Sequence, residues 1–228
     1  MLGLPYAGRW RNNSSVNRTT APATTPELSV GLRRYLYFTA AMTGAAVMIV
    51  EILGAKMLSP FVGTSHFVWT AQIAVTLVAL ACGYYAGGKL ADASQQLHRL
   101  YLAIAGAAIY LALTVLASKP IALWCLNFSL AIGSLLASTI LFFAPLGLLA
   151  MTAPFLVRVI TSSVSRVGGN VGRLTSISTA GSFLGTMLIG YVLIPFVPNS
   201  VTMYLTCLML ISVAGGYFLF WRKPGAVG

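Results

Sequence analysis

Six long apolar segments constrain this sequence more than any other feature. Five are plain, at about residues 35–57, 67–88, 99–117, 171–195 and 199–221. A sixth, at about 129–157, follows a short apolar stretch from 120 to 128 that we expect to lie at the outer interface. Each segment is near the roughly 20 residues that a helix needs to cross a bilayer core. The predicted fold class is therefore all-α, a polytopic membrane bundle of six transmembrane helices.

The charge content supports a membrane protein over a soluble one. Only 7% of the 228 residues are charged, whereas about a quarter of the residues in a soluble domain are. Pro145 and Pro154 fall in the sixth apolar segment. Each removes a backbone donor and crowds the preceding turn, so we expect both to kink that helix.

The distribution of basic residues predicts the orientation. Six crossings place twelve of the fourteen basic residues on one side, and only Lys56 and Lys119 on the other. Because cytoplasmic loops are enriched in Lys and Arg, both termini are predicted to be cytoplasmic. We expect a disordered cytoplasmic tail at 1–30, the six-helix domain at 31–223 and a short cytoplasmic tail at 224–228. The basic residues form no clustered face, which argues against nucleic-acid binding and leaves the lipid bilayer as the partner of this charge.

The sequence contains few residues that could catalyse a reaction or bind a metal. Three cysteines lie in separate apolar segments, and the chain has two histidines and three acidic residues. No catalytic triad, paired carboxylates or metal-ligand spacing can be assembled from them. We therefore expect no catalytic residues, no metal, no cofactor and no enzymatic activity of the chain alone.

Glu51 is the one acidic residue inside an apolar segment. An ionised carboxylate there costs several kcal/mol unless it is partnered, hydrated or protonated. Lys56 is a poor partner, because five residues rotate it by about 140° around the helix, and we expect it to extend to the outer interface. Gln72, at similar depth on the next helix, is the predicted partner. Glu51 is then either a cation or proton site or a hydrogen-bonded strut between two helices.

Small residues four apart predict close helix packing. Gly83 with Gly87, and Gly181 with Gly185, have the spacing that lets helix backbones approach in lipid. We favour packing within the bundle over a dimer face.

Four sequence stretches together resemble the membrane region of the bacterial spermidine synthase-like integral membrane proteins. They are EILGAKMLSPFVGTSHFVWTAQI, GYYAGGKLAD, TAPFLVR and VGRLTSISTAGSFLGTMLIGYVLIP, and the match runs from about Tyr35 to Pro198. The GGKLAD run, with Gly88 and Asp92, also resembles the first half of a loop motif of major facilitator transporters. The second half of that motif is basic, and only Arg99 of it is present here. The resemblance implies half of a major-facilitator-like bundle in a bacterial inner membrane. The aminopropyltransferase domain that often follows in that family is missing before Gly228, so its activity is not carried over.

Three functions follow as hypotheses. The favoured one is a non-catalytic membrane component in polyamine-related small-molecule handling, whose separate, soluble synthase-like partner docks at the cytoplasmic loops. The second is a half-size, homodimeric transporter of a small cation such as a polyamine. Its ligand-binding residues would be Glu51, Gln72, Trp69, Tyr84 and Tyr85, with structural or gating roles for Gly88, Asp92, Arg99, Gly181 and Gly185. The third is a structural subunit or assembly factor of a membrane complex.

Overall fold

The computed structural model describes residues 29–161 and 167–221. Within these ranges all regular secondary structure is helical, and six helices are long and apolar enough to cross a membrane. The predicted fold class is therefore confirmed as an all-α bundle of six potential membrane spans. The two expected tails lie almost wholly outside the described residues. Arg166, one of the basic loop residues at which a partner was expected to dock, also lies outside them.

The first three spans are continuous helices. They are α1 (Val30–Val62), α2 (His66–Ala93) and α3 (Leu97–Cys125). Ser29 caps α1 by accepting a hydrogen bond from the backbone N–H of Leu32, and Gly63 ends it with a φ of 85°, a conformation that favours glycine. The third span extends beyond its expected end near residue 117. α3 continues past Pro120 for another five residues, because a transmembrane helix can lose one backbone hydrogen bond to proline and still continue.

The fourth span is irregular where its prolines predicted kinks. It consists of α4 (Leu130–Ser138), the π-helical segment η1 (Thr139–Phe143), α5 (Ala144–Ala150) and α6 (Thr152–Ile160). The wider π-helical turn ends two residues before Pro145, and Pro154 lies in the first turn of α6.

Hydroxyl groups of α3 bond the backbone carbonyls beside this irregular region. The Tyr110 hydroxyl donates to the carbonyl oxygen of Ile140 at 2.6 Å, and the Thr114 hydroxyl donates to that of Leu141 at 3.1 Å. Because lipid supplies no hydrogen bonds, such side-chain donors are what make an irregular turn tolerable inside a membrane.

The last two spans repeat the pairing of a π-helical segment with a proline. The fifth consists of α7 (Val167–Leu188), the π-helical segment η3 (Ile189–Leu193) and α8 (Ile194–Phe196), and the sixth is α9 (Asn199–Phe220). Pro195 follows η3 at the same distance as Pro145 follows η1. In each case the proline ring would crowd the carbonyl four residues earlier, which the wider turn relieves.

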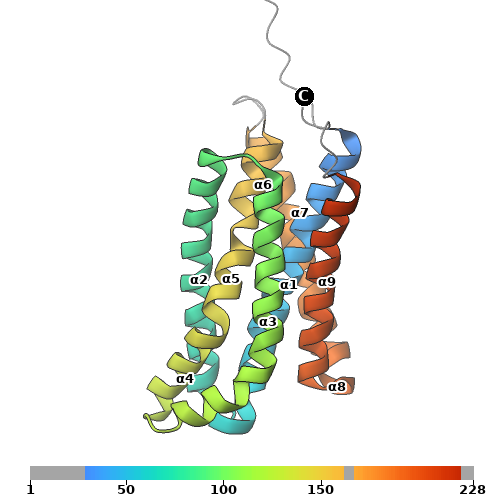
Figure 1. Cartoon of the computed structure of the whole chain (residues 1–228). Coiled ribbons are helices and arrows are strands. Elements are labelled where there is room, and N and C mark those ends of the chain that lie inside the picture. Colours follow the sequence, from blue (N-terminus) through green and yellow to red (C-terminus); the bar gives the residue numbers. More distant parts are fainter. Residues whose placement is uncertain (1–28, 162–166, 222–228) are drawn as a thin grey trace, which may run out of the picture.

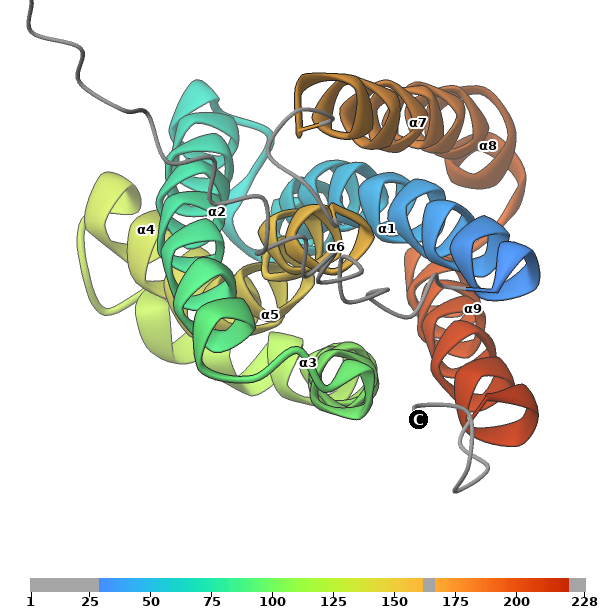
Figure 2. The same cartoon turned by 90° about the horizontal axis from the view of Figure 1, so that it is seen from above.

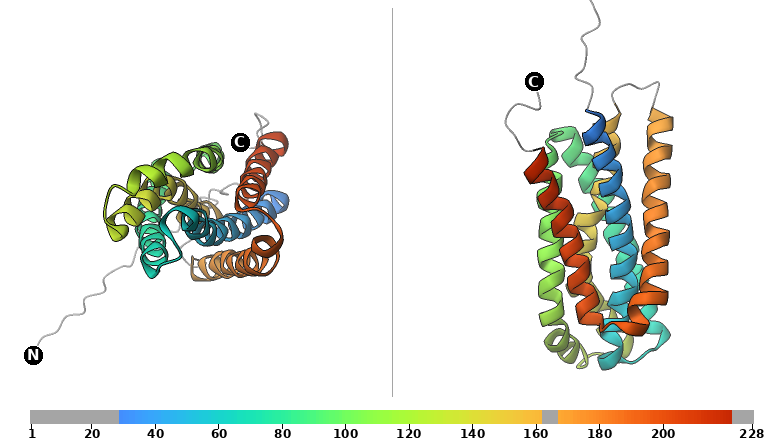
Figure 3. Two further views of the ribbon diagram at one scale, coloured as in Figure 1. Left: turned by 90° about the horizontal axis from the view of Figure 1, so that it is seen from below. Right: turned by 90° about the vertical axis from the view of Figure 1, so that its right-hand side faces the viewer.

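The helix α1 lies at the centre of the bundle. Seen along the bundle axis, α7 covers one side of α1, and α6 and α9 lie on the other (Figure 2). Figure 3 shows α1 between α9 and α7 from the side. The start of α1 and the end of α9 lie at the same end of the bundle (Figure 1). We call this the basic end, because six of the eight described basic residues lie there: Arg33, Arg34, Lys89, Arg99, Arg158 and Arg173. Lys56 and Lys119 lie near the opposite, far end.

Glycines bring two pairs of helices into backbone contact. A methyl group added to Gly181 of α7 would overlap the carbonyl of Ala41 in α1, and one added to Gly185 would lie 2.8 Å from the Cα of Ala45. On the other side, Gly87 of α2 lies against the backbone of Met151, where an added methyl group would be 2.6 Å from the carbonyl oxygen. The glycine pairs are thus used for packing within the bundle, as predicted.

Aromatic side chains join α1, α3 and α9 near the basic end. The rings of Tyr101 and Tyr217 stack with centroids 4.1 Å apart, and the Tyr101 and Thr39 hydroxyls lie 3.0 Å apart. The Tyr35 hydroxyl donates to the carbonyl oxygen of Val213. These contacts fix the three helices to one another around a fully buried tyrosine.

Candidate functional site

Glu51 lies on α1 and is partly buried. It has neither a hydrogen bond nor an ion pair with any described residue, and this includes both Gln72 and Lys56. The Gln72 amide instead packs on the backbone of Gly54, where an added methyl group would lie 2.8 Å from Nε2. The predicted Glu51–Gln72 pairing is therefore wrong. A glycine one turn further along α1 leaves a space that the amide fills.

Of the buried side chains that the structure describes, Gln72 has the most polar atoms without a hydrogen-bond partner. It is fully buried, yet neither its Nε2 nor its Oε1 has a partner among the described residues. Thr76, one turn further along α2, is buried with an unpartnered hydroxyl as well. A buried polar group without a partner costs about 1–3 kcal/mol. The far half of α2 therefore carries a polar strip whose buried groups have no partner among the described residues.

The aromatic residues proposed as cation-binding faces are split between the two halves of the bundle. Trp69 lies in the first turn of α2, whereas Tyr84 and Tyr85 lie 15 and 16 residues later, about 22 Å away along the helix axis. The ring of Tyr85 already faces Lys89, whose Nζ lies 4.6 Å from the ring centroid. Trp69 and the two tyrosines therefore cannot enclose one small ligand with Glu51 in this conformation.

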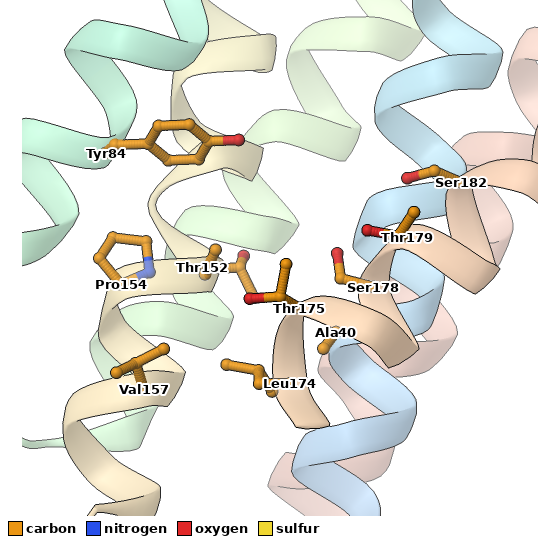
Figure 4. A pocket seen from close by; sticks show the side chains of 11 residues that line it. Ala40, Tyr84, Thr152, Pro154, Val157, Leu174, Thr175, Ser178, Thr179 and Ser182 are labelled. Carbon is orange, nitrogen blue, oxygen red and sulfur yellow. The ribbon is translucent and has the colours of Figure 1, made fainter. Parts of the chain in front are cut away.

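A cavity of about 420 Å³ lies in the half of the bundle nearer the basic end. It is bounded by α1, α2, α6 and α7, and its lining residues are Ala40, Tyr84, Thr152, Ala153, Pro154, Val157, Leu174, Thr175, Ser178, Thr179 and Ser182. Figure 4 shows the Tyr84 ring reaching from α2 toward α7, with the hydroxyls of Thr179 and Ser182 facing it from the other side. The volume lies within the range of about 300–1,000 Å³ that is typical of small-molecule sites.

Hydroxyl groups supply all the polar side chains of this cavity. Six of the lining residues carry one, from α2, α6 and α7, and none of the eleven is charged. Thr152 is 2% exposed, and its hydroxyl has no partner among the described residues. The cavity therefore offers several groups that can both donate and accept hydrogen bonds, at least one of which is left unsatisfied inside the protein.

Four of these hydroxyls form a stripe that is visible in the sequence. Thr175, Ser178, Thr179 and Ser182 are spaced i, i+3, i+4 and i+7, which places them on one face of α7. Ser178 and Ser182 pack over Gly44 of α1, where an added methyl group would lie 2.8 and 3.0 Å from their Oγ atoms. Of the residues predicted for binding, only Tyr84 lines the cavity. The stripe was not among the predicted site residues, although its spacing is the signal that would have found it.

An ion pair links α2 and α6 at the basic end. Asp92 Oδ1 lies 3.5 Å from Arg158 Nε, and both side chains are more than half exposed. Asp92, for which the sequence predicted a structural or gating role, thus contacts a neighbouring helix. Gly88 and Asp92 border a hollow of about 470 Å³, which shares Pro154 and Val157 with the hydroxyl-lined cavity. Arg99 makes no ion pair within the described chain.

The described residues contain no candidate metal site, since no three His, Cys, Asp or Glu side chains there lie close enough to hold an ion.

Comparisons with known proteins found no protein-family model, curated protein or solved structure that matches this chain. The resemblance to spermidine synthase-like membrane proteins therefore stays a prediction.

Proposed function

We propose that this chain is a non-catalytic membrane component that holds a small molecule inside its helix bundle and acts together with a partner protein. The observation that carries the proposal is the hydroxyl-lined cavity, with the buried and unpartnered Thr152 hydroxyl in its wall. A buried hydroxyl without a partner lowers stability, and a molecule in the cavity that bonds to Thr152 would remove that cost.

The basic residues support an orientation for this component. Six of the eight described basic residues lie at the end where α1 begins, and the positive-inside rule places such an end in the cytoplasm. The cavity would then be nearer the cytoplasmic face of the membrane, which we propose to be a bacterial inner membrane. A soluble partner enzyme would meet the cavity from the basic end, past Asp92 and Arg158.

The cavity does not support a polyamine as the molecule held. Polyamines carry several positive charges, and no carboxylate lines the cavity, whereas Glu51 lies outside it. A polyamine role therefore depends on the alternative function, a dimeric half-size transporter of a small cation.

One observation favours that alternative. The fifth span packs along α1 and leaves its outer face uncovered. Phe183 and Leu184 of α7 and Tyr191 of η3 are exposed there by 61%, 65% and 74%. A second copy could cover this face. If spermidine raises the thermal stability of the wild type but not of Glu51→Gln, the transporter becomes the better proposal.

The main proposal is tested by detecting a small molecule that co-purifies with the protein. The protein is purified in a detergent without a sugar headgroup and analysed by native mass spectrometry. We expect the wild type to carry a small molecule that Thr179→Phe, which fills the cavity, does not carry. Leu184→Phe is the matched control, because Leu184 lies on the exposed face of the same helix. A wild type without any bound small molecule would refute the proposal.

A further inference from the structure

The polar chemistry of the cavity wall limits what it can hold. All six polar lining side chains are hydroxyls, and the lining has no charged group. A charged molecule inside a membrane protein needs a counter-charge or extensive hydration to offset the cost of leaving water. The cavity supplies no counter-charge, so a permanently charged ligand fits it poorly.

A ligand with several hydroxyls fits the same wall well. Each serine, threonine or tyrosine hydroxyl donates one hydrogen bond and accepts others, so its partner can be a donor or an acceptor. The hydroxyls come from three helices on opposite sides of the space, with Tyr84 on α2, Thr152 on α6 and Thr179 on α7. A molecule bearing hydroxyls around a small carbon frame would reach all three sides at once.

Thr152 gives a second, independent reason to expect such a ligand. Its hydroxyl is buried and has no protein partner within the described chain. The hydroxyls of Thr175, Ser178 and Thr179 also make no hydrogen bond to any described residue. Thr175 and Thr179 are exposed and Ser178 is partly buried, so the cost of an unsatisfied buried hydroxyl falls on Thr152 alone. A polyol that bonds to Thr152 would remove this cost, which is a gain that an apolar lipid chain cannot provide.

We infer that the cavity binds a small uncharged polyol, held in part by the hydroxyls of Thr152 and Thr179. This inference rests on the proposed function, because it names the class of molecule bound at the same site. A free polyol and the glycerol headgroup of a lipid share this chemistry. The mass of the co-purified molecule distinguishes these two sources.

The test is equilibrium binding of tritiated myo-inositol to the full chain, with glycerol, glucose and spermidine as unlabelled competitors. The detergent must lack a sugar headgroup, because a maltoside is itself a polyol. We expect Thr152→Val and Thr179→Val each to weaken polyol binding by about 5- to 10-fold, the loss of one hydrogen bond. Thr186→Val is the matched control, since that hydroxyl donates to the Ser182 carbonyl at 2.9 Å and lies outside the cavity wall.

Thr152→Val carries a second readout that separates binding from folding. Because the substitution removes an unpartnered buried hydroxyl, we expect the ligand-free protein to become more stable while its polyol binding weakens. If Thr152→Val instead misfolded, both the stability of the protein and its polyol binding would fall.

Three outcomes of these experiments distinguish the polyol inference from the proposed function. Polyol binding that depends on Thr152 and Thr179 but not on Thr186 supports the inference. If no polyol binds, or if spermidine displaces the bound molecule, while Thr179→Phe still abolishes the co-purified species, the ligand class is wrong and the proposed function stands. If no polyol binds and no species co-purifies, both fail.

Discussion

The contact between α7 and α1 gives the sharpest test of the packing. Gly181 faces the backbone of Ala41, and a methyl group at Gly181 would overlap the Ala41 carbonyl oxygen and lie 2.7 Å from its Cα. Ordinary contacts of this kind are 3.4–4 Å. In Gly181→Ala the two helices must therefore separate locally by about 1 Å, because neither backbone can rotate out of the way as a side chain can.

The cost of this separation is estimated from overpacking in protein cores. Inserting a methyl group into a tight contact typically costs about 1–3 kcal/mol. Here the obstacle is backbone, and a displaced α7 also loses the close approach of Gly185 to Ala45, where an added methyl group would be only 2.8 Å from the Cα. We therefore expect Gly181→Ala to lower the free energy of unfolding by about 3 kcal/mol.

The measurement is reversible unfolding in mixed micelles, followed by circular dichroism. Gly172→Ala is the matched control in the same helix, because nothing lies within 4 Å of a methyl group added there. It should leave the free energy of unfolding unchanged or raise it by up to about 1 kcal/mol through better helix propensity. If Gly181→Ala and Gly172→Ala behave alike, α7 does not pack on α1 through this face and the reasoning is wrong.

Three further predictions concern polar side chains. Gln72→Met should raise the free energy of unfolding by about 1–2 kcal/mol in the same assay, because it removes two buried unpartnered atoms and keeps the volume; a loss of stability would mean that the amide is satisfied by water or a ligand. Thr114→Val should lower it by about 1–2 kcal/mol, since the Leu141 carbonyl loses its donor from α3, and hydrogen exchange near η1 should rise. Asp92→Asn should change it by less than about 1 kcal/mol, because the ion pair with Arg158 is exposed, and a larger loss would show that the pair is shielded from water.

The six spans were predictable because the bilayer imposes a single requirement on each of them. A helix must be apolar over about 20 residues, and hydropathy measures that property directly. The ends were less predictable, since polar and aromatic residues at the interface continue a helix without lengthening its apolar part. At Pro120 the local rule that proline breaks helices was overridden, because α3 continues to Cys125.

The site was harder to predict, because depth in the membrane does not fix rotation about a helix axis. Glu51 and Gln72 lie at similar depth, and this suggested a pair. Their orientation was decided by Gly54, whose missing side chain leaves room for the amide. The hydroxyl stripe on α7 is periodic in sequence, but only the packing of α6 and α2 around it makes it the wall of a cavity.

The two polar regions lie at different depths, and this bears on function. Thr76 ends the polar strip of the far half, and Tyr84 lies eight residues further along α2, about 12 Å away along the axis. Near Tyr84, Gly83 meets the backbone of Gly147, and so α2 and α5 are in direct contact. A transporter would need a path between the far half and the cavity, and opening one would require packed helices of the bundle to move. A component that holds its ligand from one side requires no such movement, and for that reason we favour binding over transport.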